Sequence, residues 1–97
     1  MRASTISKYH AAGDGSVFAR TLGATIRQHR ERMGMSQGEI GRPLTRAFIS
    51  QVENGHISPS LASLVLISAR LDLPAWELLK SVSEQMAKEL YSCPPPG

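Results

Sequence analysis

The sequence predicts an all-α fold of five helices, and three observations support this. The chain has 97 residues, a length typical of a single domain. Aromatic residues make up only 5% of it, so the core must consist mostly of Leu, Ile, Val, Met and Ala, a composition that suits a small helical domain better than a sheet. Apolar residues recur at helical spacing between capping and helix-breaking residues, and no strand is predicted.

The first predicted helix covers about Val17 to Met33. Its apolar positions follow the helical period, and Gly34 suits the left-handed turn that ends many helices. Residues 1–16 are polar and rich in small side chains, without periodicity, so we expect a flexible N-terminal arm there. The domain proper is expected to cover residues 17–79.

A short second helix and a third helix follow. Ser36 and Glu39 have the spacing of a capping box, which starts the second helix. Pro43 discourages helical geometry in the residue before it, so this helix must end early. Thr45 can cap the third helix, which is expected from Arg46 to about Asn54.

The last two helices are separated by "LDLP". The fourth is expected over Leu61 to Leu71, and the fifth from Pro74 to about Tyr91, because proline suits a first helical turn. An apolar stripe continues along the fifth helix, so residues 80–92 are a candidate dimerisation segment. The alternative is that this segment packs back on its own domain. Residues 93–97, "CPPPG", cannot continue the helix and are expected to form a disordered tail.

Positive charge is concentrated in the first half of the domain. Between residues 17 and 56 there are six arginines, no lysine and three glutamates. Arginine favours bidentate contacts with phosphate or guanine, which points to a nucleic-acid partner. The alternative is a solvated charged surface. No apolar run approaches the roughly 18 residues that cross a membrane, and the single cysteine, Cys93, excludes an internal disulfide and indicates a reducing, cytoplasmic compartment.

The third helix has two distinct sides when its residues are placed 100° apart. Phe48, Ile49 and Val52 fall on an apolar side. The opposite side carries side chains that pair well with base edges, and the width of a helix fits the major groove of DNA. An ordinary amphipathic helix is the alternative, but the preceding short helix and tight turn form a helix-turn-helix arrangement. The polar side comprises Arg46, Ala47, Ser50, Gln51 and Asn54.

Residues from about Phe18 to Leu79 resemble the Cro/repressor, or XRE, family of helix-turn-helix proteins. The resemblance rests on "LGATIRQHRERMGMSQGEI", "TRAFISQVENG", "SPSLASLVLISARLDLP" and "WELL", in this order and spacing. It implies a five-helix, lambda-repressor-like DNA-binding domain with an extended C-terminal helix. Members of this family usually dimerise on near-palindromic operators.

The resemblance also implies roles for individual residues. Arg30 and Glu53 match a buried structural ion pair that joins the first and third helices. The residues that match base-reading positions are Arg46, Ala47, Ser50 and Gln51. Those expected at the DNA backbone are Gln37, Arg42, Thr45, Asn54 and His56.

The turn before the third helix departs from the family pattern. Only "GRPL" separates Ile40 from Thr45, about two residues fewer than in common members. We therefore expect Pro43 and Leu44 to form the turn, with Leu44 filling the core. The effect of Gly41–Leu44 on the angle at which the domain meets DNA is left open.

The sequence thus predicts a sequence-specific, double-stranded DNA-binding transcriptional regulator that acts as a homodimer. The alternative is a protein-interaction module, similar to an antitoxin, whose C-terminal helix binds a regulatory partner. His10, His29 and His56 are isolated from other metal ligands, so neither a metal nor a cofactor is expected. No acid, base and nucleophile are assembled, so the chain is not expected to be an enzyme.

Overall fold

The computed structural model describes residues 16–90, and this part of the chain is all-helical, as the sequence predicts. Each helix begins and ends within one or two residues of its expected position where both ends are described. The predicted tail, and the arm except for Ser16, lie outside the described residues. The helices are α2 (Ser16–Arg32), α3 (Gln37–Gly41), α4 (Arg46–Glu53), α5 (Leu61–Arg70) and α6 (Ala75–Leu90).

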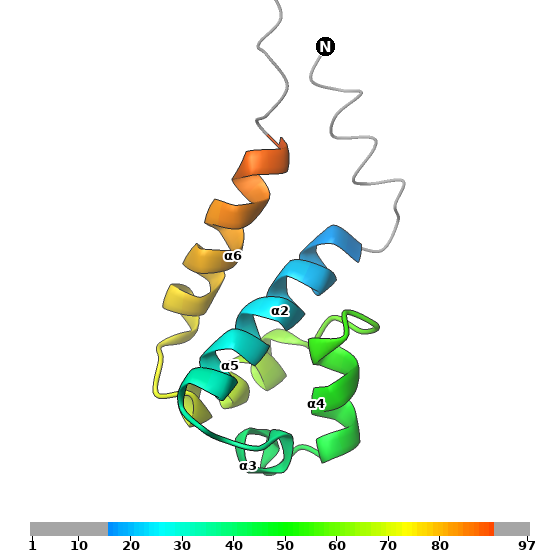
Figure 1. Ribbon diagram of the computed structural model, residues 1–97, viewed down its shortest axis with the longest axis vertical. Coiled ribbons are helices and arrows are strands. Elements are labelled where there is room, and N and C mark those ends of the chain that lie inside the picture. The colour runs from blue at the N-terminus through cyan, green and yellow to red at the C-terminus, as the bar shows by residue number, and fades with distance from the viewer. Residues whose placement is uncertain (1–15, 91–97) are drawn as a thin grey trace, which may run out of the picture.

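The arrangement is organised around α2. Helices α2 and α6 lie side by side and run in opposite directions, while α3, α4 and α5 gather around the lower part of α2 (Figure 1). No helix among the described residues is both long enough and apolar enough to cross a membrane.

Side-chain caps define where three of the helices begin. Ser36 and Glu39 form a complete capping box, in which each side chain accepts a hydrogen bond from the other residue's backbone N–H. The hydroxyl of Thr45 accepts from the backbone N–H three residues later at 3.0 Å, and Ser60 does the same at 3.1 Å. One unpaired N–H group at each of these helix starts is therefore satisfied locally, as the sequence predicted for Ser36 and Thr45.

Three helices end in the same way. In α2, α4 and α5, the two residues after the C-cap donate backbone hydrogen bonds to the last turn, which is the pattern of a Schellman motif. The first of these two residues has a positive φ. These left-handed residues are Gly34, Gly55 and Asp72, with φ of 69°, 76° and 60°.

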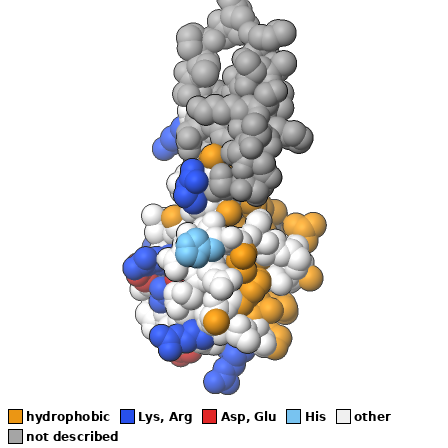
Figure 2. All heavy atoms as spheres, turned by 90° about the vertical axis from the view of Figure 1, so that its right-hand side faces the viewer, with side chains coloured by type: hydrophobic (Ala, Val, Ile, Leu, Met, Phe, Trp, Pro, Cys, Tyr) orange, Lys and Arg blue, Asp and Glu red, His pale blue; other side chains and the backbone are white. Residues whose placement is uncertain are grey.

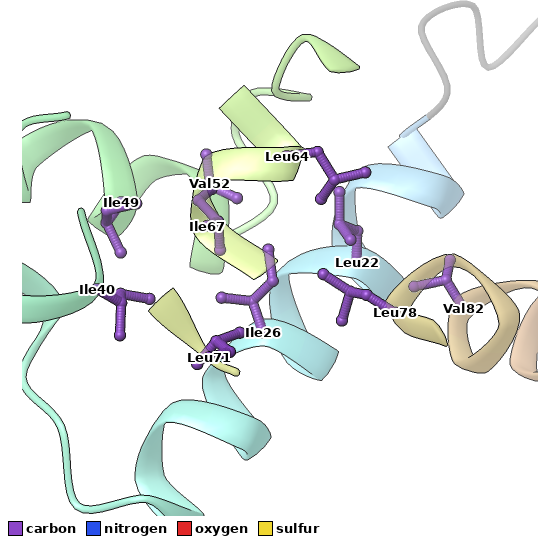
Figure 3. Packing of buried hydrophobic residues seen from close by; sticks show 10 residues of the cluster. All are labelled: Leu22, Ile26, Ile40, Ile49, Val52, Leu64, Ile67, Leu71, Leu78 and Val82. Atoms are coloured by element: carbon purple, nitrogen blue, oxygen red, sulfur yellow. The ribbon is translucent and has the colours of Figure 1, made fainter. Parts of the chain in front are cut away.

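One hydrophobic core joins all five helices. Its buried side chains come from every helix and point toward one another (Figure 3). The central members from α2, Leu22 and Ile26, are completely buried. The remaining members are Ile40, Ile49, Val52, Leu64, Ile67, Leu71, Leu78 and Val82.

A glycine allows α2 and α4 to pack with their backbones in contact. A Cβ atom placed on Gly23 would lie 2.7 Å from the carbonyl oxygen of Glu53, closer than a side chain tolerates. Gly41 has a similar role between α3 and α4, because its Cβ would lie 2.8 Å from Cγ1 of Ile49. The structure shows that its missing side chain leaves room for Ile49.

The C-terminal helix packs on its own domain over most of its described length. Val82 is buried, and Met86 is half-buried against the same core. These two residues were expected to extend an apolar stripe that is available for dimerisation. Within one chain they pack back on α2, the main neighbour of α6. The role of residues 80–92 in dimerisation stays a prediction.

Candidate nucleic-acid interface

Helix α4 places its predicted polar side at the surface. Ile49 and Val52 are completely buried, and Phe48 is half-buried against the core. Because these residues hold the apolar side inward, the opposite side faces solvent. Four of its residues are exposed, while Ser50 is only half-exposed. The exposed residues are Arg46, Ala47, Gln51 and Asn54.

The turn between α3 and α4 is compact. Helix α3 ends at Gly41, and its C-cap, Arg42, has extended backbone angles. Leu44 is half-buried and packs against the core, whereas Arg42 and Pro43 are exposed. The turn therefore holds α4 against α3 through one apolar side chain and leaves the Arg42 side chain in solvent.

An ion pair connects α2 to the last residue of α4. Arg30 donates from Nε to Glu53 Oε2 at 2.7 Å and from a terminal nitrogen to Glu53 Oε1 at 3.0 Å. A third hydrogen bond, 2.9 Å long, runs from the other terminal nitrogen of Arg30 to the carbonyl oxygen of Met35. The two side chains are 14% and 2% exposed, so this forked pair lies largely out of water. Its hydrogen bonds with Glu53 raise the pKa of Arg30.

Gln37 completes this network from the first position of α3. Its side-chain nitrogen donates to Glu53 Oε1 at 3.0 Å. The Glu53 carboxylate thus accepts hydrogen bonds from two helices, α2 and α3. The sequence assigned Gln37 to the DNA backbone, and it did not foresee the contact with Glu53. One of the two N–H groups of this amide is used inside the domain, and within residues 16–90 the other makes no hydrogen bond.

An open hollow of about 480 Å³ lies next to the network. It is bounded by the start of α3 and the start of α4. Its lining contains no acidic residue and two arginines, of which Arg30 is paired with Glu53 and Arg46 has no partner within residues 16–90. Its lining residues are Arg30, Ser36, Gln37, Gly38 and Arg46. Such a lining suits an anionic surface better than an apolar ligand.

The arginines of the first half of the domain fall into two groups. Arg27 pairs with Glu31 on the same helix at 3.0 Å, and Arg30 pairs with Glu53. Within residues 16–90, the other four make neither an ion pair nor a side-chain hydrogen bond: Arg20, Arg32, Arg42 and Arg46. Figure 2 looks onto the side where α4 lies in Figure 1, and it shows Lys and Arg side chains above and below the middle of this face.

The remaining predicted backbone residues lie at the two ends of α4. Thr45 is exposed at the N-terminal end, where its hydroxyl already serves as the cap. Asn54 is the C-cap at the other end. His56 follows and is exposed, and its backbone N–H donates to the carbonyl oxygen of Gln51 at 2.9 Å. Among the described residues, no group of three or more His, Cys, Asp and Glu is placed to hold a metal ion.

Comparisons with known proteins agree with this geometry. The family model described as Helix-turn-helix matches residues 26–75, which is more than half of the chain. No curated protein matches in sequence.

Two similar solved structures are both of the clp gene regulator ClgR from Corynebacterium glutamicum. One superposes with a TM-score of 0.69 at 21% identity, covering 77% of this chain and 82% of the ClgR chain. The other has a TM-score of 0.65 at 22% identity, covering 72% and 94%. At this identity the likeness establishes a shared fold.

Proposed function

We propose that this chain, which belongs to the XRE-type helix-turn-helix family, is a DNA-binding transcriptional regulator rather than an enzyme. We further propose that it reads a specific duplex sequence as a cytoplasmic homodimer. The observation that carries this proposal is the exposed side of α4. Its residues are short or forked hydrogen-bonding side chains and one alanine, and none of them is acidic. That set matches base edges better than it matches a face needed only for solubility.

In the proposed complex, α4 lies in the major groove. Arg46 donates two hydrogen bonds to a guanine, and Gln51 pairs with an adenine. Ala47 allows close approach and contacts a thymine methyl. Ser50 contributes less to the base contacts because it is half-buried. Eight residues give α4 a length of about 12 Å, so each copy of the chain reads only a few base pairs.

The backbone contacts position this helix. Arg42 beside the turn and the remaining N–H of Gln37 contact phosphates at the N-terminal end of α4, near the hollow described above. Thr45 lies next to them, and Asn54 and His56 serve the other end. The Arg30–Glu53 pair supports these contacts indirectly, because it fixes the direction in which the side chains of α4 point.

A homodimer would compensate for the short reading helix. Two copies of α4, one DNA turn or roughly 34 Å apart, would read a near-palindromic site. Helix α5 is the more suitable surface for a second copy, since Val82 and Met86 are used within the domain. Leu61 is 74% exposed and Val65 is 53% exposed, one helical turn later. Leu66 adds to the same apolar surface, and a hydrophobic band lies along the right edge of Figure 2.

The exposed apolar side of α5 also favours a second candidate function. A protein-interaction module, with DNA binding secondary, would use this surface for a regulatory partner. Large exposed apolar surfaces usually mark interaction sites. The two functions differ in a simple respect, because the second does not require the chain to bind duplex DNA.

Selection of bound sites from random duplex DNA tests the proposed function. We expect one enriched sequence with two related half-sites, and an affinity that falls as salt rises because bound counterions are released. The protein-interaction function would be favoured if the chain failed to bind any duplex at low salt. Enrichment of a single half-site would contradict the homodimer while leaving sequence-specific reading intact.

A further inference from the structure

Arg20 lies on α2, but its side chain packs against the turn that ends α4. A Cβ atom on Gly55 would lie 2.8 Å from Cγ and 3.0 Å from Cα of Arg20. Glycine at this position therefore leaves room for the aliphatic part of Arg20. This contact, between residues 35 positions apart in the chain, places Arg20 beside the C-terminal end of α4.

The charged group of Arg20 is exposed at this position. Within residues 16–90 it has no carboxylate partner and makes no side-chain hydrogen bond. Arg27, two turns further along the same helix, provides a contrast because Glu31 partly neutralises it at 3.0 Å. The two arginines thus share a helix and an exposed setting, but only Arg20 lies against the end of α4.

A cation at this end of α4 has a specific electrostatic use. The C-terminus of a helix carries partial negative charge, so it repels a phosphate that approaches it. Arg42 and Arg46 supply positive charge at the N-terminal end, which already favours anions. Helix α4 is about 12 Å long, and the major groove is about 12 Å wide. A helix crossing this groove therefore brings its two ends near the two phosphate backbones.

We propose that Arg20 contacts a phosphate at the C-terminal end of α4, on the backbone opposite to the one served by Arg42. This inference rests on the proposed function and adds a residue to the proposed interface. Arg20 would strengthen binding equally for any DNA sequence, since phosphate contacts position a protein on DNA and base contacts specify the site. It would also offset the negative end of α4 so that Asn54 and His56 can approach the same backbone.

The test compares Arg20→Gln with Arg27→Gln. Both changes remove one positive charge from α2, and glutamine keeps part of the aliphatic stem that lies against Gly55. Affinities of both variants and the wild-type protein are measured on a selected duplex and on a scrambled duplex, between about 50 and 200 mM salt. Thermal melting of each variant checks that the domain remains folded.

We expect Arg20→Gln to reduce the slope of log affinity against log salt by about 0.9 for each bound copy of the chain. The deficit relative to wild type would then be larger at the lowest salt than at the highest, by about 3.5-fold for one bound copy and about 12-fold for a bound dimer, and it would be equal on both duplexes. Arg27→Gln should keep the wild-type slope. Arg20→Lys, which retains the charge and the stem, should also keep that slope.

Three outcomes would overturn the inference. Equal slopes for Arg20→Gln and Arg27→Gln would show that only net charge matters. A loss confined to the selected duplex would make Arg20 a base contact, and a reduced slope in Arg20→Lys would show that charge is not the cause. In each case wild-type binding would leave the proposed function standing. Absence of duplex binding by the wild-type protein would overturn both.

Discussion

Replacement of Glu53 by glutamine tests the network that joins α2, α3 and α4. The substitution keeps the size of the side chain but removes its charge. In the wild type, this carboxylate is 2% exposed and pairs with Arg30 at 2.7 Å, and it also accepts a hydrogen bond from Gln37. The variant would leave the Arg30 guanidinium largely buried with only neutral acceptors. Breaking one side of a buried pair typically costs about 3–5 kcal/mol.

The structure favours the lower part of that range. Arg30 keeps its hydrogen bond to the carbonyl oxygen of Met35, and its side chain is 14% exposed, so water relieves part of the cost. We therefore expect Glu53→Gln to lower the free energy of unfolding by about 3 kcal/mol. For a domain of this size, that loss corresponds to a fall in melting temperature of roughly 12–24 °C.

Urea unfolding and thermal melting measure this effect, with Glu31→Gln as the matched control. Glu31 also accepts a hydrogen bond from an arginine at 3.0 Å, but both partners are more than half exposed. A surface pair contributes about 0–1 kcal/mol, so the control should change little. A loss below about 1 kcal/mol in Glu53→Gln would refute the reasoning. The double variant Arg30→Met with Glu53→Leu gives a second test. The reasoning would also be refuted if its loss of unfolding free energy equalled the sum of the losses of the two single variants.

Four further predictions follow from other parts of the structure. Gly23→Ala should destabilise the domain by about 1–3 kcal/mol or more in urea unfolding, because its Cβ meets the α4 backbone; Gly38→Ala, with no neighbour closer than 3.9 Å, should not. Burial and then the charge of Arg32 lower the pKa of His29 below 6.5. Between the pKa of His29 in the folded state and its pKa in the unfolded state, the unfolded state therefore binds more protons. Stability should fall as pH drops below about 6.5, and His29→Gln should remove this dependence in melting curves. Val65→Lys should yield a folded monomer in sedimentation if α5 forms the dimer, whereas a persistent dimer would place the interface elsewhere. Arg46→Ala should weaken binding to the selected duplex by about 1–3 kcal/mol and relax one base position, and an equal loss on all duplexes would make Arg46 a phosphate contact.

Local signals in the sequence predicted the helices and the exposed side of α4. Capping residues such as Ser36, Thr45 and Ser60 act within one helical turn, so the chain itself shows where each helix begins. The apolar period likewise identified Ile49 and Val52 as the buried side of α4. These features depend only on neighbouring residues, which is why they could be predicted without knowledge of the fold.

Contacts between residues far apart in the chain could not be predicted in this way, because no local pattern in the sequence indicates them. Gly23 resembles a weak point in a helix until its contact with the backbone of α4 is seen. Gln37 was assigned to DNA from its position alone, although its amide also bonds to Glu53. The period of α6 identified Val82 and Met86 as apolar, but it could not distinguish a second copy of the chain from α2 as their neighbour. The partner of an apolar stripe is a property of the tertiary fold.

The turn between α3 and α4 is shorter than in common members of the family, and the packing around α4 accommodates the shorter connection. Only residues 42–44 and the cap Thr45 separate α3 from α4, so the two helices must lie close together where they meet. Gly41 makes this approach possible because any larger side chain would meet Ile49. Leu44 then fills the edge of the core. The direction of α4 is thus set at its start by Gly41 and Leu44 and at its end by Glu53, which Arg30 and Gln37 hold. A longer turn would relax only the first of these constraints, so in the proposed complex the angle at which α4 meets DNA would depend on the buried ion pair as well as on the turn.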